Sequence, residues 1–68
     1  MATYDSLPTQ ARLDVDECVN AFFYGGKKLG TRTFQAVAQA RKMPRWAAAA
    51  LGDVIRARLV VLGYLPIR

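Results

Sequence analysis

The sequence predicts an all-α protein, a small domain of three helices that assembles as a homodimer through the third. Apolar residues recur at helical spacing in three segments, and no stretch alternates apolar and polar residues as a half-buried strand does. Glycine and proline residues separate the three segments. We expect one domain over residues 1–68, with helices at about 7–24, 32–42 and 44–62.

Length and composition limit the possible classes of protein. A chain of 68 residues has room for one small core, which rarely supplies more than about 3–5 kcal/mol. Cys18 is the single cysteine and histidine is absent, so we expect no internal disulfide, no metal and no other cofactor. The N-terminus lacks the pattern of a signal peptide, and no apolar run approaches the roughly 18 residues that span a bilayer. A soluble, cytoplasmic protein without a membrane partner is expected.

The first helix is expected to begin after a capping Ser6, with Pro8 tolerated in its opening turn. Its apolar stripe consists of Leu7, Ala11, Val15, Cys18, Val19 and Phe22. The sequence "YGG" at 24–26 should end this helix, because glycine readily adopts the left-handed conformation of a C-cap.

The second helix is expected to follow a glycine-rich loop at 25–33, with Thr31 or Thr33 capping its free amides. It should end near Lys42, because Pro44 disfavours helical geometry in the residue before it. The third helix then starts at Pro44 and is terminated by Gly63.

The third helix carries two apolar faces. One face combines Ala47, Leu51, Val54, Ile55, Leu59 and Leu62. A second seam has the heptad spacing of a helix–helix contact and consists of Ala50, Val54, Ala57, Val61 and Tyr64. Two short helices cannot easily cover both faces, so we expect the second seam to form a dimer interface. In the alternative, the protein is a monomer and both faces contact the first two helices.

Arg58 projects near the middle of the first apolar face. An uncompensated charge there would be costly, so its guanidinium should pair with Asp14 or Glu17 of the first helix. The alternative is that Arg58 lies at the end of the core and reaches water.

Charge is distributed unevenly along the chain. Residues 1–20 carry a net charge of −3 and residues 21–68 a net charge of +8. The cations that could contact nucleic-acid phosphates are Lys27, Lys28, Arg32, Arg41, Lys42 and Arg45. Residues 37–59 resemble a helix-turn-helix in layout, but four alanines follow Trp46 where base-reading side chains would be needed. Sequence-independent binding is therefore the form of this hypothesis, and solvated loop charges are its alternative.

Catalysis is not expected. Gly25 and Gly30 match the outer glycines of a phosphate-binding loop, but Thr31 and Arg32 replace its lysine and hydroxyl residue. Cys18 lies on an apolar stripe, where a thiol is usually inert. The acidic residues of the first helix are typical of a solvated edge, and we expect no small-molecule substrate.

A protein target is the remaining hypothesis. Trp46 with Arg45 or Arg56 would form the kind of aromatic and arginine patch that anchors interfaces, and Tyr24 is a further candidate. In the alternative, Trp46 closes the core against Phe23 or Phe34. We therefore expect a non-enzymatic regulator or inhibitor that binds a larger protein. The second hypothesis is a basic DNA-binding protein, helix-turn-helix-like or sequence-independent, that contacts phosphates through the 25–33 loop and the 41–45 turn.

Overall fold

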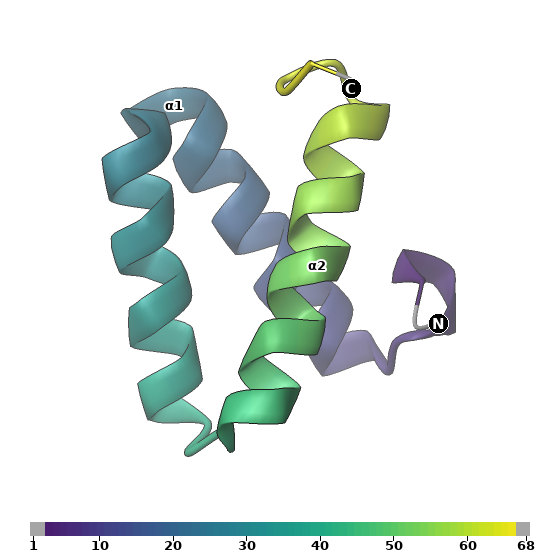
Figure 1. The fold of residues 1–68 in the computed structure, drawn as a ribbon, viewed down its shortest axis with the longest axis vertical. Helices are drawn as coiled ribbons and strands as arrows, with labels where there is room; N and C mark the ends of the chain where they lie inside the picture. Colours follow the sequence, from purple (N-terminus) through teal and green to yellow (C-terminus); the bar gives the residue numbers. More distant parts are fainter. Residues whose placement is uncertain (1–2, 67–68) are drawn as a thin grey trace.

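The computed structural model describes residues 3–66, which form a short 3-10 turn and two long helices. The turn η1 spans Tyr4–Ser6, α1 spans Thr9–Ala40 and α2 spans Arg45–Val61. The all-α prediction is confirmed, since these residues contain no strand. In Figure 1, α1 reverses its direction partway along, and α2 then runs back beside it. Within the same range, neither helix is both long and apolar enough to cross a membrane.

Gly26 produces the reversal in α1. Its φ of 80° and ψ of 173° are not helical, and they divide α1 into a first arm, residues 9–25, and a second arm, residues 27–40. A positive φ of this kind favours glycine, which lacks a Cβ atom. The expected loop at 25–33 is therefore wrong, because one residue makes the turn and the helix resumes directly after it.

The two arms of α1 pack closely where the second arm begins. Gly30 is buried there, and a Cβ atom at this position would overlap the ring of Phe22 on the first arm. The absence of a side chain at Gly30 therefore allows the arms to approach each other near the turn.

The predicted helix ends are partly wrong. Pro8 is the N-cap residue of α1, whereas Ser6 belongs to η1 and its hydroxyl donates to the Thr3 carbonyl at 2.8 Å. The hydroxyls of Thr31 and Thr33 donate to carbonyls four residues earlier, at 2.9 and 3.0 Å, so these residues lie inside the second arm and do not cap it.

The ends of α2 agree better with the prediction. Pro44 is its N-cap residue, and Leu62 is its C-cap. Gly63 follows with a φ of 83°, as expected for a terminating glycine.

The core lies between α1 and α2. It consists of Val15, Cys18, Val19, Val37, Leu51, Val54, Ile55 and Leu59. The predicted stripe of the first arm and one predicted face of α2 thus meet each other. Leu62 departs from that prediction, since it lies just beyond the end of α2 and is 43% exposed.

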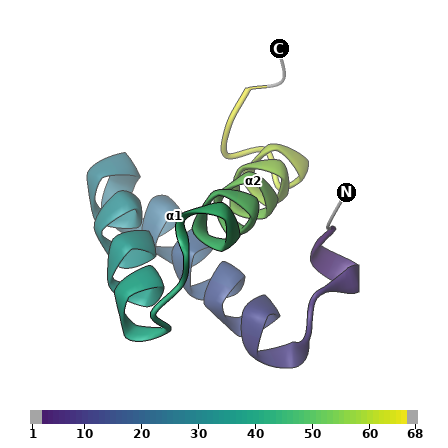
Figure 2. The same cartoon turned by 60° about the horizontal axis from the view of Figure 1, so that its bottom comes forward.

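The predicted partner of Arg58 is also wrong. Its guanidinium lies over the Tyr4 ring, 4.3 Å from the ring centroid, and the Tyr4 hydroxyl donates to both oxygens of Asp16 at 2.9 Å. Asp14 is instead paired with Arg41 at 3.2 Å. Figures 1 and 2 show the reason, because α2 lies between the second arm of α1 and the N-terminal turn that carries Tyr4.

Candidate binding surfaces

The side of α2 that faces away from the core carries a row of exposed residues, apolar except for Asp53, here called the outer stripe. Its members are Trp46, Ala50, Asp53, Ala57 and Val61, all exposed. Trp46 is 76% exposed and Val61 is 74% exposed. Spacings of three and four residues keep these five positions on one side of the helix.

The outer stripe overlaps the predicted dimer interface without matching it. Ala50, Ala57 and Val61 belong to both. Val54 is only 4% exposed and belongs to the core, so it is not available to a partner. Tyr64 is engaged elsewhere, since its ring stacks on Phe23 with centroids 4.6 Å apart.

Trp46 stands in the first turn of α2 and does not close the core. Arg45 is its exposed neighbour in the same turn. Arg56 is ten residues further along, which places it about 15 Å away along the helix axis. Trp46 and Arg45 are thus exposed neighbours in one turn, and both are separated from Arg56.

Tyr24 lies at the other end of the molecule, beside the turn at Gly26. It is 82% exposed and makes an edge-to-face contact with Phe23, with ring centroids 4.8 Å apart. Together with Tyr64 these two residues form an exposed aromatic cluster. Tyr24 is thus separated from Trp46, and the predicted protein-binding residues divide between the two ends of α2.

The predicted nucleic-acid residues divide in a similar way. Lys27, Lys28 and Arg32 occupy the first two turns of the second arm, and all three are exposed. Arg41, Lys42 and Arg45 gather around the turn after Ala40, and Arg41 lies about 14 Å from Arg32 and about 21 Å from Lys27 along the second arm. Within this second group, Arg41 is committed to Asp14. The cations therefore form two separate patches and not one continuous surface.

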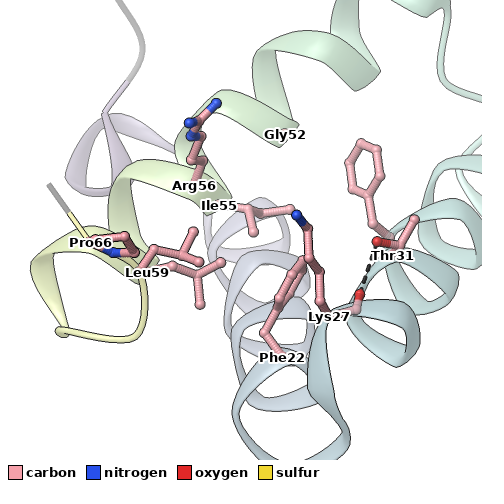
Figure 3. Close-up of a pocket in the computed structure, with 10 residues that line it drawn as sticks. Phe22, Lys27, Thr31, Gly52, Ile55, Arg56, Leu59 and Pro66 are labelled. Atoms are coloured by element: carbon pink, nitrogen blue, oxygen red, sulfur yellow. Dashed lines mark hydrogen bonds between the residues drawn. The ribbon is translucent and has the colours of Figure 1, made fainter. Parts of the chain in front are cut away.

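A groove of about 440 Å³ opens between α1 and α2 (Figure 3). Its apolar walls are formed by Phe22, Phe34, Ile55, Leu59, Leu65 and Pro66. Lys27, Thr31, Gly52 and Arg56 complete the lining. From the sequence alone, Lys27 and Arg56 belong to different candidate sites, because no local signal connects residues so far apart in the chain. The turn at Gly26 brings them to one groove.

Cys18 is fully buried in the core. Burial, together with the nearby carboxylates of Glu17 and Asp14, raises the pKa of its thiol from 9.0 to about 11. The thiol is therefore protonated at neutral pH and unsuited to act as a nucleophile. Across residues 3–66, no three cysteine and acidic side chains gather as a metal site would require.

Comparison of the chain with known protein families, with curated proteins and with solved structures finds no match.

Proposed function

We propose that this protein is a non-enzymatic regulator or inhibitor that binds a larger protein through the outer stripe of α2. The observation that carries the proposal is the exposure of Trp46, at 76%, in the first turn of an otherwise small-residue face. A large aromatic side chain held on a rigid helix is the usual anchor of a protein interface. Arg45 lies beside it, and arginine, like the aromatic residues, is enriched at protein interfaces.

The stripe also indicates the chemistry of the partner. Ala50 and Ala57 leave the backbone of α2 accessible, so a partner helix could approach it closely. Asp53 stands between them, and a partner should present lysine or arginine opposite this carboxylate. We therefore propose a helical partner surface that is apolar, with one basic side chain near its middle.

A second copy of this chain is the other candidate occupant of the stripe, as the predicted homodimer requires. Asp53 lies near the midpoint between Trp46 and Val61. An antiparallel pair in full register would therefore bring two Asp53 carboxylates together, which is unfavourable. We accordingly propose a different protein as the main partner, and sedimentation velocity distinguishes the two cases by mass.

Site-specific photo-crosslinking tests the proposal. A photo-reactive residue is introduced at Ala57 on the stripe or, as a matched control, at exposed Gln35 on the second arm of α1. Each variant is illuminated in an extract of cells that produce the protein. We expect one discrete protein adduct from the Ala57 position alone, and its loss when Trp46→Ala is added.

Adducts that are equal from both positions, or that survive Trp46→Ala, would contradict the proposal. Circular dichroism of each variant confirms that the helices are intact. The adduct is then identified by mass, and its affinity for the wild-type chain and for Trp46→Ala is measured with purified proteins.

Sequence-independent DNA binding is the second candidate function, favoured by the exposure of Lys27, Lys28 and Arg32 on neighbouring turns. Fluorescence anisotropy of a labelled random duplex at several salt concentrations tests it. Binding that weakens steeply with salt, and that is lost when these three cations are replaced with alanine, would support this function. No binding at low salt would remove it.

A further inference from the structure

We propose that the groove between α1 and α2 binds a fatty acid, with its carboxylate held by Lys27 and Arg56 and its acyl chain against the apolar walls. The site is separate from the outer stripe, because none of the five stripe residues lines the groove. The protein would thus have a small-ligand site in addition to its protein-binding surface.

Two walls of the groove, Ile55 and Leu59, belong to the buried core. Ile55 is 3% exposed and Leu59 is 1% exposed, so their side chains form a fixed floor. Leu65 forms one side, because the chain after α2 folds back and the Leu65 amide donates to the Leu59 carbonyl at 3.4 Å. Gly52 has no side chain, so α2 leaves space in the groove beside the ring of Phe34. The groove is therefore part of the fold and is available before any ligand arrives.

The charges of the groove are of one sign. Lys27 and Arg56 are both exposed, and over residues 3–66 neither has a carboxylate within ion-pair distance. Lys27 extends from α1 toward Ile55, and Arg56 is the residue that follows Ile55 on α2 (Figure 3). The Thr31 hydroxyl donates to the Lys27 carbonyl at 2.9 Å. The two cations are thus the free polar groups that a ligand would meet.

A fatty acid fits both properties. Free phosphate would satisfy the cations but leave the six apolar walls in contact with water. A neutral apolar molecule would cover the walls but offer nothing to the cations. The volume of about 440 Å³ lies within the roughly 300–1,000 Å³ of small-ligand sites, and it is too small to enclose a partner helix. The acyl chain of a fatty acid would fit this volume and cover the apolar walls, and its carboxylate would pair with the cations.

The test is a titration of the full chain with sodium decanoate below its micelle concentration, followed by NMR of the methyl groups. We expect saturable shifts at Ile55, Leu59 and Leu65. Replacing both groove cations, Lys27→Gln with Arg56→Gln, should weaken decanoate binding by about tenfold or more, because each loses a charged hydrogen bond.

A matched variant controls for net charge. Lys28→Gln with Arg45→Gln removes two exposed cations that do not line the groove, and it should change decanoate affinity by less than about twofold. Decanol, which lacks the charge, should bind the wild type more weakly than decanoate and should not respond to the loss of Lys27 and Arg56. Gly52→Leu should abolish binding by filling the groove while keeping α2 helical.

Several outcomes would overturn the proposal. These are the absence of shifts at the groove methyls, equal weakening by the two double variants, or unchanged binding to Gly52→Leu. Shifts centred on Phe23 and Tyr24 would assign decanoate to the aromatic cluster instead. The proposed protein-binding function is unaffected by any of them, since it is tested by crosslinking at Ala57.

Discussion

The two sides of α2 differ in what covers them, although both are largely apolar. The inner side, which carries Leu51, Ile55 and Leu59, is buried against α1. The outer side carries Ala50, Ala57 and Val61, and it faces solvent within the single chain. Apolar periodicity on a helix therefore indicates that a side is suited to packing, but it does not show whether the neighbour lies in the same chain.

The turn at Gly26 explains the difference. It returns the second arm of α1 toward the first, so that both arms and the core of α2 lie together. Within residues 3–66, the outer side of α2 stays exposed after that arrangement is made. It is the side that we propose a partner covers.

The largest expected difference between the two sides is in stability. Leu59→Ala, on the inner side, should lower the free energy of unfolding by about 2–5 kcal/mol, because it leaves a cavity in the core. Val61→Ala, on the outer side, should change it by less than about 0.5 kcal/mol. Urea denaturation followed by circular dichroism measures both.

Since Leu59→Ala could abolish folding in so small a core, Ile55→Val provides a milder variant with an expected loss of about 0.5–1.5 kcal/mol. Equal losses for the inner and outer substitutions would show that the outer side is also buried in solution.

Thiol reactivity compares the core, where Cys18 of α1 lies, with the outer stripe of α2. The raised pKa of Cys18 leaves about a hundredfold less thiolate at neutral pH than an ordinary thiol has. Ala57→Cys adds a thiol on the exposed stripe, which should react much faster with a disulfide reagent. Comparable rates for the two thiols would contradict the placement of Cys18 in the core.

The same pKa predicts an effect of pH on stability. Because the folded pKa, about 11, exceeds the unfolded value of 9.0, the contribution of Cys18 is complete below pH 9.0 and is lost as the pH rises toward 11. Cys18→Ser should remove this contribution, so the variant should lose less stability than the wild type as the pH rises from 9.0 toward 11. Urea denaturation across that pH range measures the difference.

Gly30 and Gly52 differ in how much space surrounds them. Gly30→Ala should destabilise the protein by about 1–3 kcal/mol, because its Cβ atom would overlap the Phe22 ring. Gly52→Ala places its Cβ atom 3.6 Å from Phe34, an ordinary contact, and should be neutral or stabilising by up to about 1 kcal/mol. Thermal unfolding measures both. A loss of stability in both variants would show that α2 does not tolerate a side chain beside the groove.

The smallest effect is expected at the N-terminal turn. Tyr4→Phe removes the hydrogen bond to Asp16 but keeps the ring beneath Arg58, so the melting temperature should fall slightly. The hydrogen bond to Asp16 raises the pKa of Tyr4 above 10.0, so its contribution is present below pH 10.0 and is lost as the pH rises further. The difference between wild type and variant should therefore disappear at high pH. A constant difference would exclude this hydrogen bond as its cause.

Much of the fold could be predicted from local patterns. The spacing of Val15, Cys18 and Val19 predicts a helix with one buried side, and that side is buried. Gly63 and Pro44 mark the ends of α2 because their backbone preferences act on single residues. Patterns of this kind depend only on residues that are close together in the chain, so they can be recognised from the sequence alone.

Long-range positions could not be predicted in the same way. Asp14 pairs with Arg41, and Arg58 contacts Tyr4, because of how the arms of α1 and the N-terminal turn lie around α2. The groove likewise depends on the turn at Gly26, which brings Lys27 to the side of α2 that carries Arg56.

The sequence by itself thus determined the helical class, the apolar sides and most of the core, since each follows from the periodicity of a single segment. Tertiary structure alone decided which apolar side of α2 is covered and which cations line the same groove. Those outcomes depend on the direction the chain takes at Gly26, and one left-handed residue changes the position of everything after it.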